Sequence, residues 1–232
     1  MNVTWLGQAG LLFETQKIKI LIDPYLSNSC GEKNPKSNRR MPVDPAFLKI
    51  CPDVIVLTHD HLDHTDEQTL THYLKSNSNV LVLAAPNAWN HVRSFGGNNN
   101  YVRFTRGTEW THEGLCFRAV KAEHSDVEAI GVILDDGMKK YYITGDTLYN
   151  EAIFSDLPSD IDTVFLPING KGNNFNAIDA ARFATRIGAR HAFPLHFGMF
   201  DDFTADMFDF PGKIVAEIYR PMNLDESIGG TV

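Results

Sequence analysis

Three histidines and three aspartates lie within ten residues, in the segment LTHDHLDHTD at residues 57–66. Four of them, His59, His61, Asp63 and His64, have the spacing His-x-His-x-Asp-His. Because alternate residues of a strand share a face, a strand that runs into this segment places His59 and His61 on one side. A tight turn then brings Asp63 and His64 back toward the same point. Imidazole nitrogens and carboxylate oxygens are the ligands that Zn²⁺, Fe²⁺ and Mn²⁺ accept, so the spacing predicts a metal site.

The alternative is a solvated polar turn whose side chains contact only water. Histidines gathered without a metal or counter-ion repel one another as they protonate, and this disfavours the alternative. Four of the six other histidines, at positions 72, 91, 112 and 191, match no such pattern and are expected in ordinary surface or packing roles.

The elements that must position this segment can be predicted from the apolar runs around it. Val54 to Leu57 reads as a strand buried on both faces, and Asp66 is placed to cap a helix that reaches Leu74. Further strands are predicted at 10–15, 18–22, 80–84, 115–122, 129–134, 140–144, 163–166 and 191–195, and further helices at 86–95 and 177–187.

Strands followed by helices, repeated once, predict an α/β (α+β) fold, a four-layered αββα sandwich. Its two ββα-type halves, roughly 1–110 and 111–220, would share one core in a single domain over 1–232, with 221–232 as a polar tail.

The length and composition of the chain indicate what kind of protein it is and which partners it can bind. A chain of 232 residues with 43% hydrophobic and 22% charged residues is typical of a soluble globular protein. The net charge of −8 disfavours nucleic acid as a partner, because phosphate binding needs a basic surface. Three scattered cysteines predict reduced thiols, and the first residues lack the basic start of a signal peptide. No apolar run approaches the roughly 20 residues that span a bilayer, so we expect a cytoplasmic protein without a membrane partner.

A polar segment at residues 27–45 contains three prolines and shows no periodicity, so a long loop is predicted. Its cations Lys33, Lys36, Arg39 and Arg40 would either contact an anionic substrate or simply face water.

The His-x-His-x-Asp-His motif resembles the signature of the metallo-β-lactamase fold superfamily. Four further segments resemble that family's pattern in the same chain order: ILIDPYL with Asp23, VKAEHSD with His124, YYITGDT with Asp146 and AFPLHFG with His196. The segments WLGQAGLLFE and FLPINGKGN are similar to sequences of the branch that contains ascorbate-6-phosphate lactonases.

This resemblance implies two divalent metal ions, zinc for preference, with manganese or iron(II) as alternatives because the same ligands accept all three. The implied ligands are His59, His61 and His124 for the first ion, Asp63, His64 and His196 for the second, and Asp146 between both. Asp23 would support the ligands from behind.

The resemblance also implies a metal-dependent hydrolase. Two such ions, about 3.5–4 Å apart, can share a water and lower its pKa toward 7, so no protein nucleophile is needed. Asp63 would orient the resulting hydroxide or carry a proton. The expected substrate is a small, anionic ester or lactone such as a sugar-phosphate lactone. Tyr149, Asn169 and Lys171 follow strand ends and are expected to contact it, with turn residues in water as the alternative.

Three other functions remain open at this point. A phosphodiesterase or nuclease of the same fold is the first, and a non-catalytic metal-binding protein is the second. The third, reduction of oxygen or nitric oxide at two irons, is disfavoured because those relatives resemble His-x-Glu-x-Asp-His, with a carboxylate where this chain has His61. Self-association into a homo-oligomer is also left open.

Overall fold

The computed structural model describes residues 1–225, which form two β-sheets and four α-helices. The first sheet contains β1 (Asn2–Gly7), β2 (Gly10–Glu14), β3 (Lys19–Ile22), β4 (Val54–Leu57), β5 (Leu81–Ala84), β6 (Asn100–Arg103) and β13 (Pro221–Asn223). The second contains β7 (Glu109–His112), β8 (Leu115–Lys121), β9 (Ile130–Asp135), β10 (Lys140–Ile143), β11 (Ile161–Pro167) and β12 (His191–Leu195). The helices are α1 (Ser29–Lys33), α2 (Glu67–Ser76), α3 (Pro86–Val92) and α4 (Ala177–Arg186).

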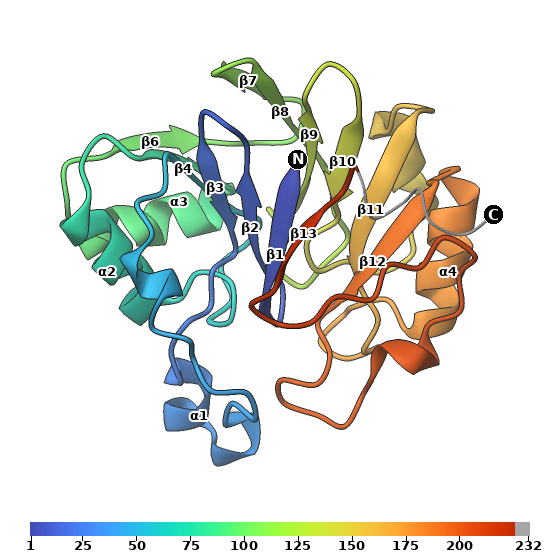
Figure 1. The fold of residues 1–232 in the computed structure, drawn as a ribbon, viewed down its shortest axis with the longest axis horizontal. Helices are drawn as coiled ribbons and strands as arrows, with labels where there is room; N and C mark the ends of the chain where they lie inside the picture. The colour runs from blue at the N-terminus through green and yellow to red at the C-terminus, as the bar shows by residue number, and fades with distance from the viewer. Residues whose placement is uncertain (226–232) are drawn as a thin grey trace.

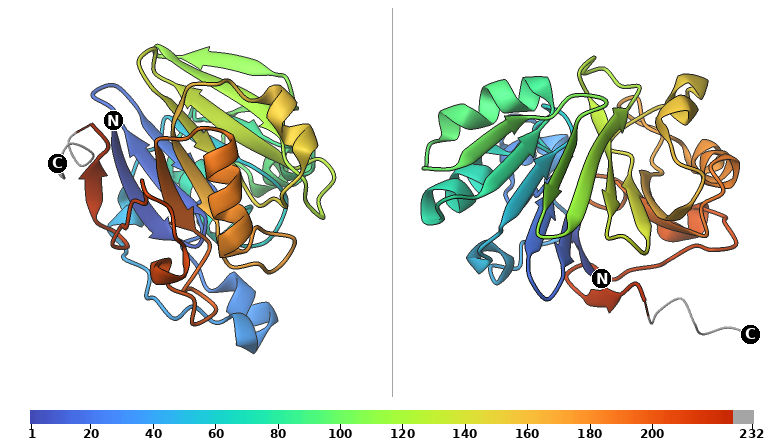
Figure 2. Two further views of the ribbon diagram at one scale, coloured as in Figure 1. Left: turned by 90° about the vertical axis from the view of Figure 1, so that its right-hand side faces the viewer. Right: turned by 90° about the horizontal axis from the view of Figure 1, so that it is seen from above.

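The two sheets pack face to face, with α2 and α3 outside the first sheet and α4 outside the second (Figures 1 and 2). The strand orders are β13-β1-β2-β3-β4-β5-β6 and β12-β11-β10-β9-β8-β7. This arrangement confirms the predicted αββα sandwich. No helix within residues 1–225 has both the length and the apolar character that a membrane span requires.

Three apolar layers hold the sandwich together. Between the sheets lie fully buried aromatic rings such as Phe13 and Phe165, whose centroids are 5.2 Å apart. Leu70 and Tyr73 of α2 pack on the outer face of the first sheet, and Phe183 of α4 packs on the second. Burial of this apolar surface is the main force that holds both helical layers in place.

The sequence correctly predicted the bounds of the buried strand β4, the residue that caps the start of α2 and the residue that follows the end of α4. β4 has the predicted bounds, and its four residues are fully buried. The side chain of Asp66 accepts the Thr69 backbone N–H at the start of α2, as an N-cap does. Gly188, with a left-handed φ of +68°, follows the end of α4.

Several elements were not predicted. β1, β6, β7 and β13 are additional strands, and α1 and a short 3₁₀ turn at Pro35–Ser37 lie inside the segment 27–45 that was predicted as a loop. Most residues of β6 and β7 are partly or fully exposed, so no apolar run marks them. β13 takes three residues of the predicted tail, and residues 226–232 of that tail lie outside the described part of the chain.

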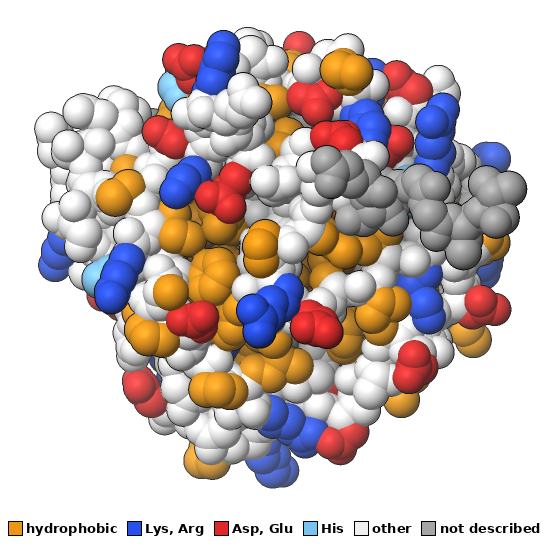
Figure 3. Space-filling view, viewed as in Figure 1, with side chains coloured by type: hydrophobic (Ala, Val, Ile, Leu, Met, Phe, Trp, Pro, Cys, Tyr) orange, Lys and Arg blue, Asp and Glu red, His pale blue; other side chains and the backbone are white. Residues whose placement is uncertain are grey.

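The segment that leads into β13 connects the two sheets on the face seen in Figure 1. Ala192 of β12 exchanges backbone hydrogen bonds with Gly212 and Ile214, and Tyr219 donates its N–H to the Trp5 carbonyl of β1. Apolar side chains gather over this region (Figure 3), where Val215 is 61% exposed.

Parallel pairing determines where the strand ends lie. β3, β4, β5 and β6 pair in parallel in the first sheet, as β10, β11 and β12 do in the second. The carboxyl ends of parallel strands meet at one edge of a sheet, and there their loops can build a common site.

Candidate metal centre

The first group of candidate ligands consists of His59 and His61, which follow β4, and His124, which follows β8. One ring nitrogen from each lies within 4.8 Å of the others, and His61 Nδ1 is 3.1 Å from His124 Nε2. His59 is fully buried, and its Nε2 has no hydrogen-bond partner within residues 1–225. Burial, reinforced by the nearby His64, lowers the pKa of His59 well below its usual value, and burial also lowers the pKa of His124. A buried imidazole nitrogen without a proton or partner has the chemistry of a metal ligand.

The second group consists of Asp63 and His64, from the same segment as His59, and His196, which follows β12. Their ligand atoms also lie within 4.8 Å of one another, and Asp63 Oδ2 is 3.3 Å from His196 Nε2. Burial disfavours the protonated imidazoles, but neighbouring carboxylates outweigh it. They raise the pKa of His196 to about 9 and raise that of His64 well above its usual value.

Asp146, which follows β10, lies against the second group and influences the first. Its Oδ2 is 3.4 Å from His64 Nε2 and 3.1 Å from His196 Nε2. Burial alone would raise the pKa of this carboxyl, but the opposing effect of His196 and His64 is larger. The pKa is therefore lowered well below its usual value, and the group is ionised. Its charge also acts on His59 and His124, against the larger effect of burial. One carboxylate therefore interacts with both groups.

Asp23 lies behind the ligands, at the end of β3. Its Oδ1 accepts the Thr58 backbone N–H at 2.8 Å, and its Oδ2 accepts the Thr58 hydroxyl at 2.6 Å and His64 Nδ1–H at 2.8 Å. Thr58 Oγ1 lies 3.0 Å from His59 Nδ1, so the same carboxylate orients two imidazoles. With the Nδ1 atoms occupied, the Nε2 atoms of His59 and His64 face the site, and neither has a hydrogen-bond partner within residues 1–225, although His64 Nε2 lies within ion-pair distance of Asp146. An oxygen of Asp23 also lies within 4.8 Å of a nitrogen of His59 and of His64, but this carboxylate already accepts three hydrogen bonds, so we assign it a supporting role and not that of a ligand.

Two polar side chains to which the sequence analysis assigned no role, those of Gln8 and Asn174, also contact the ligands. Gln8, in the turn between β1 and β2, donates its side-chain N–H to Asp63 Oδ2 at 2.8 Å and lies 3.1 Å from the His196 ring nitrogens. Asn174 donates to Asp146 Oδ2 at 3.0 Å. Gln8 lies within WLGQAGLLFE, one of the segments that carry the family resemblance, but the sequence analysis assigned no role to this residue.

Backbone conformation around the site is unusual. Seven non-glycine residues among those described have a left-handed φ, and four of them contact the ligands or are ligands: Gln8, Asp23, Asn173 and His196. The Asn173 carbonyl lies 3.2 Å from His124 Nδ1, and the Gln8 carbonyl accepts the His196 N–H at 3.0 Å. Such conformations persist only where the surroundings enforce them, and they cluster at functional sites.

A cavity of about 380 Å³ opens over the two groups of ligands. Asp63, Asp146 and His196 line it from below, and two exposed cations, Lys36 and Lys171, belong to its lining. Lys171 Nζ lies 3.6 Å from Asp201 Oδ2, which moderates but does not remove its positive charge. The lining therefore combines ligands at the base with two cations from separate loops.

The predicted substrate contacts are placed differently from one another. Asn169 and Lys171 line this cavity, and Asn169 Nδ2 lies 2.9 Å from His196 Nδ1. Tyr149 does not line it, because its ring packs against Phe154 and Phe183 beneath the guanidinium of Arg182. We therefore exclude Tyr149 from the site.

Only one cation of the 27–45 segment lines the cavity, namely Lys36. Arg39 is held by the Tyr25 carbonyl and the Tyr219 hydroxyl, and Arg40 pairs with Asp202. The expectation of an anion-binding loop therefore rests on a single residue of this segment.

Comparison with known proteins gives consistent matches. A family model described as a beta-lactamase superfamily domain matches residues 19–197. A UPF0173 metal-dependent hydrolase from Ligilactobacillus salivarius is 30% identical over 97% of this chain and 100% of its own, and one from Carboxydothermus hydrogenoformans is 27% identical over 92% of each. Among solved structures, an isothiocyanate hydrolase from Delia radicum gut bacteria has a TM-score of 0.75 at 19% identity, and covers 97% of this chain and 99% of its own.

Proposed function

The chain belongs to the beta-lactamase superfamily of metal-dependent hydrolases, and from this premise we propose that it binds two divalent ions and hydrolyses a small, anionic ester or lactone. The observation that carries the proposal is the convergence of seven side chains from four strand ends, together with two buried histidine nitrogens that lack hydrogen-bond partners within residues 1–225. Unpartnered buried polar atoms are costly, so their presence favours a bound ligand.

The donor set fits divalent ions. His59, His61 and His124 would hold one ion, and Asp63, His64 and His196 the other, with Asp146 shared. Nitrogen and carboxylate oxygen ligands suit zinc first, and also manganese or iron(II). Ions bound there would supply Lewis acidity, lowering the pKa of water and polarising a carbonyl oxygen.

Residues of the chain itself would orient the attacking water. In ester or lactone hydrolysis the water oxygen bonds to the carbonyl carbon, the ester C–O bond breaks, and a proton from the water ends on the departing alkoxide. Burial raises the pKa of Asp63, but the opposing effect of His64 and His196 is larger and lowers it overall, so its carboxylate is ionised and would accept a hydrogen bond from the water and orient it. Gln8 holds Asp63 Oδ2 and thereby fixes its orientation.

Substrate charge follows from the lining of the cavity. Lys36 and Lys171 are its two lysines, and both are exposed to an entering molecule. Both cations would attract a phosphate or carboxylate on the substrate, while the Asn169 amide would contact groups near His196.

The test is a substrate screen on metal-loaded protein, with metal content measured on the same sample. We expect turnover of anionic lactones or esters, loss of most activity and weaker metal binding in His61→Ala, and nearly unchanged behaviour in His72→Ala. His72 lies on α2, where its Nε2 is 2.7 Å from the Leu48 carbonyl and its ring packs edge to face on the neighbouring Tyr73, away from both groups of ligands. Selective turnover of phosphodiesters would favour the phosphodiesterase alternative, and bound metal without any turnover would favour a non-catalytic protein.

A further inference from the structure

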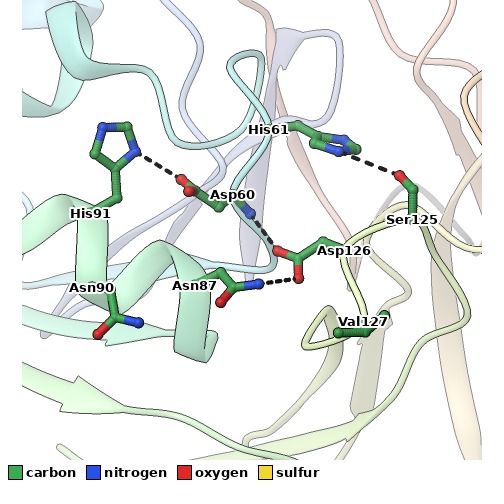
Figure 4. A pocket seen from close by; sticks show the side chains of 8 residues that line it. All are labelled: Asp60, His61, Asn87, Asn90, His91, Ser125, Asp126 and Val127. Atoms are coloured by element: carbon green, nitrogen blue, oxygen red, sulfur yellow. Dashed lines mark hydrogen bonds and ion pairs between the residues drawn. The ribbon is translucent and has the colours of Figure 1, made fainter.

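A second cavity begins at His61 and extends away from the metal centre, between α3 and the loop that follows β8 (Figure 4). Its volume is about 610 Å³, and it is lined by Asp60, His61, Asn87, Asn90, His91, Ser125, Asp126 and Val127. His61 and Ser125 line both cavities. A molecule that reaches the ligands through the first cavity is therefore in direct reach of the second.

The walls of this second cavity are fixed by hydrogen bonds around Asp126. Its Oδ1 accepts Asn87 Nδ2–H at 2.7 Å and the Glu128 backbone N–H at 3.0 Å, and its Oδ2 accepts the Asp60 backbone N–H at 3.0 Å. These contacts join α3, the ligand segment and the loop after β8, as Figure 4 shows. The carboxylate of Asp126 is thus occupied in maintaining the shape of the cavity.

Other polar atoms of the lining are free to bind a ligand. Asp60 Oδ1 accepts His91 Nδ1–H at 2.9 Å, but Asp60 Oδ2, Asn87 Oδ1 and the whole side-chain amide of Asn90 have no hydrogen-bond partner within residues 1–225. Acceptors therefore outnumber donors among these free atoms. The lining includes two carboxylates and neither lysine nor arginine, so it favours O–H or N–H donors and disfavours anions.

The two cavities differ in their charged side chains. The first contains Lys36 and Lys171, and of its three carboxylates Asp63 and Asp146 belong to the candidate ligands while Asp201 lies beside Lys171. The second contains two carboxylates without a lysine or arginine in its lining. We propose that the substrate spans both cavities, with its anionic group beside these lysines and an uncharged, hydroxyl-bearing part between α3 and the loop after β8. The scissile bond would lie between them, over the ligands. Val127, which is 89% exposed at the rim, would contact the carbon skeleton of the hydroxyl-bearing part. This assignment rests on the proposed hydrolase function and identifies the class of group that a natural substrate carries.

A matched pair of uncharged lactones tests the assignment. D-glucono-delta-lactone and delta-valerolactone share a six-membered ring and differ in their hydroxyl groups. For the metal-loaded wild type we expect the lower KM for the hydroxylated lactone, with spontaneous hydrolysis subtracted. Asn90→Leu removes one hydrogen-bonding side chain, so KM for the hydroxylated lactone should rise about five- to tenfold. The kcat and KM values for delta-valerolactone, which has no hydroxyl group, should not change.

Asn98→Leu is the matched control, because Asn98 is an exposed turn residue outside both cavities. Turnover of delta-valerolactone alone would support the hydrolase function while refuting the proposed cavity. An equal effect of Asn90→Leu on both lactones, or no effect on either, would also refute it.

A binding measurement separates this proposal from the hydrolase function if neither lactone is turned over. Zinc-loaded, isotope-labelled protein would be titrated with sorbitol and, separately, with sodium sulfate, while the side-chain amide signals of Asn87 and Asn90 are recorded by NMR. Saturable shifts with sorbitol, weakened in Asn90→Leu at the Asn87 signal, support the assignment. No shift with sorbitol, or a saturable shift with sulfate instead, overturns it.

Discussion

Replacement of Asp23 by asparagine changes one buried atom behind the metal centre and should weaken metal binding. The Asp23 carboxylate accepts three hydrogen bonds, from the Thr58 backbone, the Thr58 hydroxyl and His64 Nδ1. An amide offers one acceptor oxygen and places an N–H₂ donor where the other oxygen was. We expect the amide oxygen to remain on the Thr58 backbone N–H, because that buried donor has no other partner within the described residues.

The amide nitrogen then faces His64 Nδ1, and two donors cannot share that contact. His64 is forced into the tautomer that carries its proton on Nε2, the atom that faces the metal. Loss of a partner that orients a metal-bound histidine typically costs about 10- to 100-fold in affinity, or roughly 1.4–2.7 kcal/mol. The second ion should be affected more than the first, because neither His61 nor His124 is held by Asp23.

The assay is a competition titration of Zn²⁺ against a chromogenic chelator, with thermal unfolding of the metal-free protein recorded in parallel. Asp53→Asn is the matched control, since Asp53 also accepts a backbone N–H, that of Lys19 at 2.8 Å, but precedes the other end of β4 and is exposed. Wild-type affinity for both ions in a folded Asp23→Asn protein would refute the role assigned to Asp23.

Three further predictions concern charge. In the metal-free protein the pKa of His196 is raised to about 9, so its stabilising contribution is complete below its unfolded value of about 6.5 and is lost as the pH rises through about 9. The unfolding temperature of the metal-free protein should therefore fall over this range, and that of the zinc-loaded protein should fall less. Lys36→Ala should raise KM for an anionic substrate several-fold without changing KM for an uncharged one, as steady-state kinetics with a matched substrate pair would report. The Arg106 guanidinium lowers the pKa of Asp156, so the pair stabilises the fold above the unfolded pKa of about 3.9 and ceases to do so as the pH falls through the lower, folded value. Asp156→Asn should cost about 1 kcal/mol in urea unfolding near neutral pH and progressively less in acid.

The fold could be predicted from the sequence where local signals and burial coincide. Continuous apolar runs marked β4 and β12, and the Asp66 cap marked the start of α2. β13 could not be predicted in this way, because it pairs with β1 from the opposite end of the chain and has no apolar run of its own. Pairing of that kind depends on tertiary structure, which local patterns do not encode.

The same distinction between local patterns and tertiary contacts applies to the residues of the site. Ligand types that follow strand ends could be predicted, because parallel strands bring their carboxyl ends together. Gln8 and Asn174 could not, because each acts through contact with a side chain from a different strand. Tyr149 follows a strand end too, yet its ring points toward α4, and the position of a residue in a loop does not determine the direction of its side chain.

The histidines of the two groups of ligands differ in pKa, which the His-x-His-x-Asp-His motif does not show. This difference predicts the order in which the two metal ions bind. Burial lowers the pKa of His59 and His124, so these ligands are already deprotonated near neutral pH. Carboxylates raise the pKa of His64 and His196, so there a metal ion must displace protons.

The first equivalent of zinc should therefore bind at the group that contains His59 and release few protons, and the second should release more and gain affinity as the pH rises. Calorimetric titration near pH 7, repeated in buffers of different ionisation enthalpy, counts the protons released at each step. Two equivalents that bind with equal affinity and equal proton release would show that the carboxylates do not hold protons on His64 and His196. The electrostatic difference between the groups would then have no consequence for metal binding.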